Sequence, residues 1–242
     1  MNQMEKISGS TIRYKYLAPI AMLYITVMLC DMMLAYRMIS FGSVTLAGGI
    51  FVLPLFYFLS DIISEVYGYQ RARQVIWFML LCAFIFAMFL SLINLLPRPA
   101  FWQEGAAYDL VFEHLFRIAI GGGFLAILFG AFINNYIITK WKVLIKGRHY
   151  WLRSFGATAV GEFVQNFMGC LILYLGVIPL AKVFELVVPL YLIQITEGLL
   201  LTIPGTILVA LLKRAEGVDV YDYETNFNPL KISISNEYSS KE

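Results

Sequence analysis

The sequence is poor in charged residues. Only 14% of its 242 residues are Asp, Glu, Lys or Arg, whereas 60% are hydrophobic, which is far too apolar for an ordinary soluble domain. Its formal net charge of +2 is too small to indicate a nucleic-acid partner. The uncharged segment Gln74–Pro97 is long enough to cross a bilayer as a helix. The composition therefore predicts a protein whose main surroundings are the lipid bilayer.

Residues that commonly build metal or nucleophilic sites are also scarce. The three cysteines, Cys30, Cys82 and Cys170, lie in separate apolar segments without paired spacing, which favours apolar packing over disulfides or metal ligation. The two histidines fall in predicted loops on opposite sides of the membrane, so a hydrolytic triad is not expected. The glycine run at 121–123 lacks the Lys-Ser/Thr of a phosphate loop. We therefore expect no metal, no cofactor and no ATP-driven pumping by this chain alone.

Hydropathy predicts an all-α membrane protein with six spanning helices. The six segments are Leu17–Ile39, Val44–Tyr67, Gln74–Leu96, Leu115–Thr139, Ser154–Ile178 and Leu186–Leu212. With a cytoplasmic N-terminus, the basic residues left outside are only Arg37, Arg98, Arg117 and Lys182, and the positive-inside rule then places both termini in the cytoplasm. The chain would comprise a cytoplasmic segment 1–16, a transmembrane domain 17–212 and a polar, loosely ordered tail 213–242.

Two local features modify this outline. The outer loop from Pro97 to His114 is a candidate for a short surface helix. Pro189 and Pro204 fall within the last predicted helix, and prolines at such positions would kink or end it.

The most informative stretch of the sequence is Ser60–Arg73. It carries Asp61 and Glu65 four residues apart, so a helix places both carboxylates on one face. A carboxylate at membrane depth is costly unless it meets a partner, a cavity or a solute. Two interpretations stay open: an interfacial salt-bridge network or gate with Arg71 and Arg73, or direct handling of a solute or proton.

Other polar side chains also fall within the predicted helices. They are Asp31, Glu162 and Glu197, and the amides Asn94, Asn134, Asn135, Gln165, Asn166 and Gln194. Glu162, Gln165 and Asn166 share one helix face. Because a lipid-facing charge would cost ~2.5–3.5 kcal/mol on insertion scales, we expect these faces to point inward. Carboxylate and amide groups match neighbouring donors and acceptors on a planar heterocycle. A purine-like solute is favoured, although amino acids also suit such groups.

Some of these residues have a structural alternative. Asp31 could pair with Arg37 or Arg117 near the outer surface. Asn134 and Asn135 could bond to neighbouring helices without touching a solute. Both alternatives are left open at this point.

The run Asp61-Ile-Ile-Ser-Glu-Val-Tyr-Gly-Tyr69, followed by Ala72-Arg73, resembles the hallmark of the queuosine-precursor transporter family, also called the vitamin-uptake-transporter-like family. Further matches are Pro54, Trp77, Tyr150–Arg153 and Tyr223–Pro229. The resemblance implies a six-helix protein of the bacterial inner membrane that imports deazaguanine bases used to make the queuosine of tRNA. It also implies a fold similar to the substrate-binding subunits of energy-coupling-factor transporters, working without their ATPase module.

Several positions depart from the family pattern. The family usually has Ser, Tyr, Gln and Asp along the fourth helix, where this sequence has Gly123, Ile127, Ala131 and Asn134. Gln165 and Asn166 stand where an Asp-Thr pair is expected, and Asp31 replaces an Asn. Several of these would be pocket positions, so a paralogue that carries a related base or another solute stays open.

The sequence as a whole predicts an importer of a queuosine precursor, either 7-cyano-7-deazaguanine or 7-aminomethyl-7-deazaguanine. Glu162, Gln165 and Asn166 would read the polar edge of the solute, and Asp61 and Glu65 would complete the site or form the gate. The remaining candidate contacts are Asn134, Glu197 and Asp31. Homodimer formation and the choice between proton coupling and facilitated diffusion are left open. The rival functions are transport of another small solute, a membrane scaffold and an intramembrane enzyme.

Overall fold

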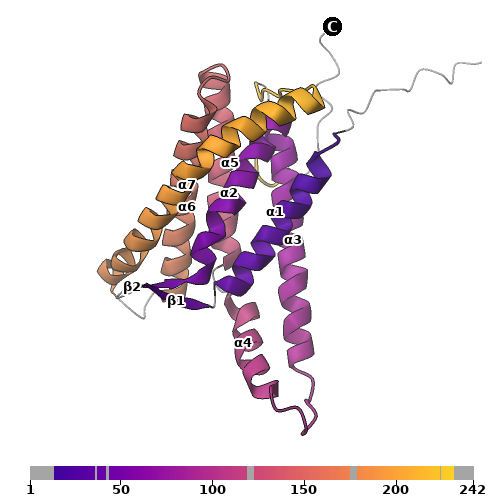
Figure 1. The fold of residues 1–242 in the computed structure, drawn as a ribbon, viewed down its shortest axis with the longest axis vertical. Coiled ribbons are helices and arrows are strands. Elements are labelled where there is room, and N and C mark those ends of the chain that lie inside the picture. The colour runs from indigo at the N-terminus through magenta and orange to yellow at the C-terminus, as the bar shows by residue number, and fades with distance from the viewer. Residues whose placement is uncertain are drawn as a thin grey trace, which may run out of the picture.

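The computed structural model describes residues 14–35, 37–41, 44–118, 123–174, 179–223 and 225–231. In them the chain forms helices α1 (Leu17–Leu34), α2 (Leu53–Tyr67), α3 (Tyr69–Asn94), α4 (Gly105–Ile118), α5 (Phe124–Leu144), α6 (Tyr150–Tyr174) and α7 (Leu180–Glu216). An antiparallel hairpin of β1 (Met38–Phe41) and β2 (Val44–Ala47), followed by the 3-10 turn η1 (Gly48–Phe51), connects α1 to α2. Figure 1 shows these helices as one bundle, with the hairpin at one side.

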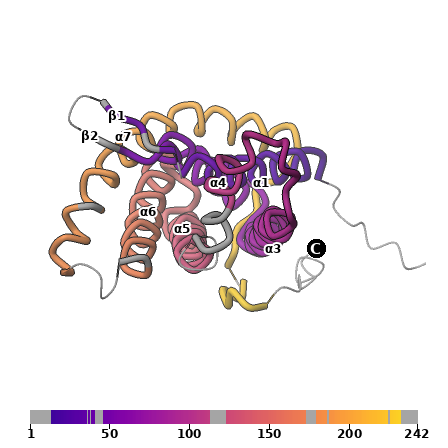
Figure 2. The backbone as a smooth tube through the Cα atoms, turned by 90° about the horizontal axis from the view of Figure 1, so that it is seen from below, coloured from indigo at the N-terminus to yellow at the C-terminus, as the bar shows by residue number. Residues whose placement is uncertain are grey.

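Helix α2 lies at the centre of the bundle. It packs against α1, α3, α5, α6 and α7, and twelve of its fifteen residues are buried. Viewed from below, α6, α5 and α3 stand nearly end-on in a row, and α7 crosses the bundle beside them (Figure 2). We refer to the end of the bundle with β1 and β2 as the hairpin end. The end where α2 meets α3 and α7 terminates is the tail end.

The surface of the bundle is suited to lipid. Five segments in the described part of the chain are long and apolar enough to span a bilayer: Leu17–Leu34, Gly48–Tyr67, Tyr69–Asn94, Phe124–Leu144 and Leu180–Glu216. Large apolar side chains are exposed along them, including Leu23, Phe78, Phe89, Leu200 and Ile207. Exposed apolar surface on this scale indicates contact with lipid rather than water. The prediction of an all-α, multi-pass membrane protein is confirmed.

The sixth predicted span corresponds to α6. This helix has 25 residues, hence a length of roughly 37 Å at 1.5 Å per residue, and it packs between α5 and α7. It is less apolar than the five segments above and is not among them. A topology of six spans, with both termini on one side, therefore stays a prediction.

The structure corrects several predicted boundaries at the hairpin end. The predicted helix from Val44 to Tyr67 is wrong at its start, because Val44–Ala47 pairs with Met38–Phe41 as a hairpin. The predicted first helix likewise ends at Leu34 rather than at Ile39. The expected surface helix exists as α4, and it extends to Ile118. Part of the predicted fourth helix lies outside the described residues, and its described part begins again at Phe124.

The last helix is much longer than predicted. Helix α7 continues through Pro189 and Pro204 for 37 residues, or roughly 55 Å, which exceeds the bilayer core. Figure 1 shows it running obliquely across the bundle, as a helix longer than the membrane thickness would. The prolines do not end it, because tertiary packing in membrane proteins compensates for the backbone hydrogen bonds that proline removes. It ends at Gly217, whose φ of 69° is the left-handed geometry of a helix C-cap.

The expectation of a loosely ordered tail is wrong for residues 217–231 as far as they are described. Asp222 accepts a hydrogen bond from the backbone N–H of Tyr69 at 3.1 Å, and the Tyr69 hydroxyl donates to the carbonyl of Phe227 at 2.9 Å. Trp77 Nε1 donates to the carbonyl of Pro229 at 2.7 Å. The tail therefore runs along the start of α3 as a fixed part of the fold.

Candidate functional site

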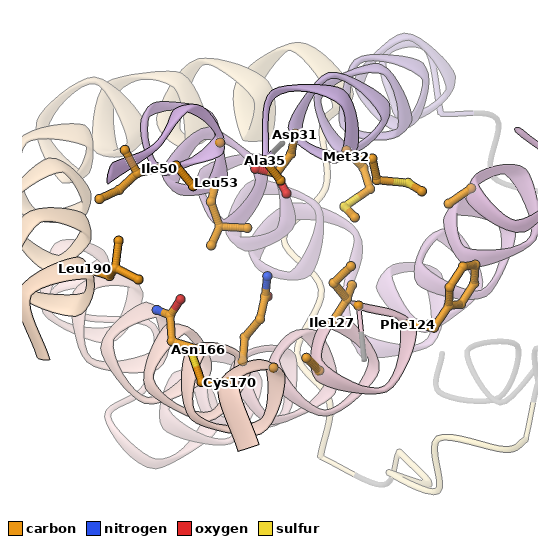
Figure 3. A pocket seen from close by; sticks show the side chains of 18 of the residues that line it. Asp31, Met32, Ala35, Ile50, Leu53, Phe124, Ile127, Asn166, Cys170 and Leu190 are labelled. Carbon is orange, nitrogen blue, oxygen red and sulfur yellow. The ribbon is translucent and has the colours of Figure 1, made fainter. Parts of the chain in front are cut away.

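A cavity of about 250 Å³ lies between the helices at the hairpin end (Figure 3). The last turns of α1, η1, the start of α5 and facing turns of α3, α6 and α7 surround it. Most of its wall is apolar, formed by residues such as Met28, Leu53, Phe124, Ile127 and Leu190. Its polar groups are few: Asp31, Gln165, Asn166 and Gln194. An apolar pocket with a small number of placed polar groups is the usual form of a small-molecule site.

Asp31 is on one wall of the cavity and Asn166 on the opposite wall (Figure 3). The Asp31 carboxylate fits closely against η1, since a Cβ added to Gly49 would lie 2.5 Å from Asp31 Oδ1. No hydrogen-bond donor or cation for this carboxylate occurs in the part of the chain that the structure describes. Asp31 therefore has carboxyl oxygens that can meet a hydrogen-bond donor or a cation of whatever enters the cavity.

Hydrogen bonds fix the orientation of the amides on the opposite wall. Asn166 Nδ2 donates to Gln194 Oε1, which links α6 to α7. Gln165 Oε1 accepts a hydrogen bond of 2.8 Å from the hydroxyl of Tyr57 on α2. Each amide keeps further donors or acceptors that can meet a ligand. The two walls together can hold a flat molecule by polar groups at its edges and by apolar contact on its faces.

Asp61 lies outside this cavity, fully buried where α2 meets α5 and α6. Asn134 Nδ2 donates to Asp61 Oδ1 at 2.7 Å. Ser154 and Thr158, from successive turns of α6, both donate to Asp61 Oδ2, the latter at 3.1 Å. Asp61 thus accepts hydrogen bonds at both of its oxygens and connects α2 to α5 and α6. One of its three donors, Asn134, was also a predicted site residue.

Glu65 is the centre of an ion-pair network at the tail end. Its oxygens lie 2.6 Å from Arg153 Nη1, 2.6 Å from Lys213 Nζ and 3.7 Å from Lys142 Nζ. Asp219 of the tail pairs with Lys142 at 2.6 Å and with Lys213 at 2.8 Å. These contacts tie α2, α5, α6 and α7 to the tail. The bundle is closed at this end by opposite charges.

The two arginines expected to pair with the motif carboxylates have other contacts. The guanidinium of Arg71 lies 5.6 Å from the ring centre of Tyr14. Arg73 is buried and donates to the carbonyls of Asn226 and Asn228 at 2.9 and 2.8 Å. The sequence correctly suggested a salt-bridge network at this end, but Glu65 forms it with Arg153, Lys142 and Lys213.

The two tail carboxyl groups differ in their electrostatics. Burial acts to raise the pKa of Asp219, but hydrogen bonds from Lys142 and Lys213 hold it below its ordinary value. Burial raises the pKa of Asp222 above its ordinary value, with hydrogen bonds from Thr225 and the Tyr69 backbone opposing the shift. Because its folded-state pKa is depressed, Asp219 stabilises the attached tail above the ordinary aspartate range. That contribution is lost as pH falls through the lowered pKa.

Glu162 lies between these groups, one turn along α6 from Gln165. It is fully buried and is not part of the cavity wall, so its predicted contact with the solute stays a prediction. Neither carboxylate oxygen has a hydrogen-bond partner among the described residues. Glu197 on α7 is close enough to interact electrostatically with Glu162. One of its carboxylate oxygens, Oε2, is also buried without a hydrogen-bond partner among the described residues.

The structure therefore divides the predicted site residues into groups. Asp31, Gln165 and Asn166 share the cavity; Asp61 and Asn134 bond to each other; Glu65 belongs to the ion pairs at the tail end. The prediction missed the cations around Glu65. It named Gln194 as an inward-facing amide without assigning it to the site, and the structure places Gln194 on the cavity wall. The cations were visible only as interfacial charges, because nothing in one sequence pairs them with a carboxylate on another helix.

Comparison with known proteins agrees with this architecture. The family model described as "Putative vitamin uptake transporter" matches residues 47–209, which include α2, α5, α6 and most of α7. The chain belongs to this family. The recognition made from the Asp61–Tyr69 motif is thereby confirmed, and the protein is a multi-pass membrane transporter of the vitamin and queuosine-precursor uptake family.

One curated relative of this transporter is the protein named "Probable queuosine precursor transporter" of Bacillus subtilis (strain 168). It is 26% identical over 163 residues, covering 66% of this chain and 69% of the relative. No solved structure matches the chain. The similarity to energy-coupling-factor subunits therefore stays a prediction.

Proposed function

We propose that this transporter imports a queuosine precursor across the bacterial inner membrane and that its preferred cargo is 7-aminomethyl-7-deazaguanine. The observation that carries the proposal is the Asp31 carboxylate, which faces the cavity without a cation among the described residues. The aminomethyl precursor carries a primary amine, which is protonated at neutral pH like a lysine side chain. The cyano precursor has no such charge.

The rest of the cavity suits the deazaguanine ring. Its apolar wall can cover the faces of a bicyclic ring, and its volume of about 250 Å³ suits a small molecule. Gln165 and Asn166 present amides to a polar ring edge, the arrangement by which amide side chains read base edges. Asp31 on the opposite wall would meet the donor groups of the ligand. The relative's printed name supports a cargo of this class.

The charges favour one orientation in the membrane. Lys142, Arg153 and Lys213 cluster at the tail end, which the positive-inside rule assigns to the cytoplasm. With six spans, both termini are cytoplasmic and the cavity opens toward the outside. Glu65 and its cations then close the inner side, so this conformation would be the outward-facing one. Import requires a second conformation in which that network opens.

The proposal is tested by ligand-induced thermal stabilisation of the purified transporter in detergent. The panel contains the aminomethyl and cyano precursors, queuine, guanine and an unrelated vitamin. A ligand that binds only the folded state raises its apparent stability with concentration. We expect the aminomethyl compound to stabilise most. Asp31→Asn should weaken its binding about tenfold or more, since a charged hydrogen bond contributes ~1.5–3 kcal/mol.

The matched control is Glu185→Gln, which removes an exposed carboxylate of α7 that pairs with Lys182 outside the cavity. Its binding should equal that of the unchanged protein. Equal stabilisation by the two precursors, or an Asp31→Asn variant that keeps its preference for the amine, would contradict the role of Asp31. A folded protein that no deazaguanine stabilises would direct the search to another solute class.

A further inference from the structure

Glu162 has an environment that solute recognition does not explain. It contributes nothing to the cavity wall, its side chain is fully buried, and both of its oxygens lack a partner among the described residues. Burying a polar group without a hydrogen bond is unfavourable, and burying an unpaired charge is far more so. Such a carboxyl group is stable in this conformation only as the neutral acid.

The groups that face Glu162 do not compensate a charge on it. From α2 they are Tyr57 and Asp61, and from α7 they are Tyr191 and Glu197. On α5 the nearest contact is at Asn134, whose Cβ would lie 2.9 Å from a Cβ on Gly161 beside Glu162. None of these groups is a cation. Among the lysines of α5 and α7, Lys142 and Lys213 belong to the network around Glu65, Lys182 pairs with Glu185, and Lys140 lies over the ring of Phe227.

Asp61, which lies closer to the tail end than Glu162, is buried among hydrogen-bond donors rather than without them. It lies within electrostatic reach of Glu162, and three donors from α5 and α6 bind its two oxygens. Hydrogen bonds donated to a carboxylate stabilise its charged form, whereas burial without donors stabilises the neutral form. Two neighbouring carboxyl groups in contrasting environments are the usual arrangement for giving and accepting a proton.

We propose that the transporter is a proton symporter in which Glu162 carries the proton. This inference rests on the proposed function for its solute, but the state of Glu162 can be measured without any solute. Glu162 would take one proton from the outer water through the cavity beside Gln165. It would keep that proton while buried and release it, by way of Asp61 or water, once the inner side opens. The proton and the solute thus enter in the same cycle.

The geometry also gives a reason for coupling. Conformational exchange with Glu162 buried is favourable only when the group is protonated, because an ionised form would have no donor or cation beside it. An unprotonated carrier with solute in its cavity would therefore be held in the state that hydrates Glu162, whereas the empty carrier can admit water to Glu162 and return without a proton. Each inward cycle then requires a proton from the outside.

The first test is infrared spectroscopy of the full-length transporter, purified and without solute, at neutral pH. The C=O stretch of a protonated carboxyl group should be present and should decrease in Glu162→Gln. The control Glu185→Gln, which removes an exposed carboxylate paired with Lys182, should leave this band unchanged. A band of equal intensity in Glu162→Gln and in the unchanged protein would overturn the proposal.

The second test measures uptake of labelled 7-aminomethyl-7-deazaguanine into proteoliposomes with and without an acidic exterior. The ratio of the two rates should be well above one for the unchanged protein and should fall to one for Glu162→Gln. Addition of solute should acidify the lumen of proteoliposomes that contain the unchanged protein, but not of those that contain Glu162→Gln. Thermal melting of Glu162→Gln verifies that the variant is folded.

The outcomes separate the two proposals. Uptake of the precursor by the unchanged protein at a ratio of one, without acidification of the lumen, would overturn proton coupling and leave the cargo intact. The precursor could fail to bind and to enter while the carboxyl band still depends on Glu162. That result would overturn the cargo assignment and the symport of this cargo with protons. The protonated state of Glu162 would stand in that case.

Discussion

At the scale of single residues, Glu65 concentrates the most electrostatic interaction. Its side chain is almost fully buried, yet it meets three cations from α5, α6 and α7. A buried charge is tolerated only where such partners offset the loss of hydration. Removing the carboxylate would leave buried positive charge with Asp219 as the acidic partner that remains.

Glu65→Gln should therefore destabilise the transporter strongly. Breaking a buried ion pair by removing one partner costs about 3–5 kcal/mol, because the other charges stay buried. Thermal unfolding in detergent would measure the loss as a large drop in melting temperature. Glu185→Gln breaks an exposed pair with Lys182, where less than about 1 kcal/mol is expected. Similar melting temperatures for the two variants would show that the network contributes little.

At the scale of elements, the break between α2 and α3 depends on Gly68. Its φ of 82° is strained for residues with a side chain, and the tail passes directly over it. A Cβ at this position would lie 2.7 Å from Val220 Cγ1. The turn and the tail thus require the same glycine for two reasons.

Gly68→Ala should both strain the turn and displace the tail. The backbone conformation alone costs roughly 1–3 kcal/mol, which thermal unfolding can detect. Displacement would make the segment after Gly217 more susceptible to limited proteolysis. Gly198→Ala is the matched control, because its Cβ would lie at an ordinary 3.6 Å from Thr158 Cγ2. An intact, protected tail in Gly68→Ala would show that Val220 moves aside at little cost.

Prediction from the sequence succeeded where a long physical signal exists. The apolar segments located the helices, because each must present some twenty apolar residues to lipid. The spacing of Gln165 and Asn166 correctly indicated an inward face. The hairpin was missed because strands as short as Val44–Ala47 are apolar enough to read as the start of the next helix.

Pairing between distant segments could not be predicted from one sequence. Glu65 lies 88 positions from Arg153 and 148 from Lys213, and Arg71 and Arg73 were the obvious partners only because they are near in the chain. Likewise, Asp31 and Asn166 meet across a cavity that exists only after α1 and α6 are packed. Such contacts follow from the topology, which local periodicity does not encode.

At the scale of the whole molecule, the transporter has two unlike ends. The hairpin end holds an apolar cavity with few polar groups, and the tail end is closed by charges and by residues 217–231. The tail bonds to α3 through Tyr69, Arg73 and Trp77 and to α5 through Lys142. It therefore acts as a clasp that holds separate helices together.

A chain truncated after Gly217 should lose this clasp. We expect lower thermal stability, because Lys142 loses Asp219 and the carbonyl of Val220 and keeps only Glu65 as an acceptor. Buried donors left without acceptors cost about 1–3 kcal/mol. A chain truncated after Lys231 is the matched control, since it keeps every tail contact described above. Equal melting temperatures for the two truncated proteins would show that the tail is not a stabilising clasp.

The position of the clasp also bears on how the protein is made. Ribosomes synthesise residues 217–231 after α1 to α7, so the earlier helices can enter the bilayer and pack before the tail leaves the ribosome. During that interval Lys142 and Arg73 do not yet have the acceptors that the tail supplies. The tail end is therefore completed late in biogenesis, once the tail has left the ribosome and docked. A chain terminated before this segment would leave in the membrane a carrier that is inserted but still unfinished.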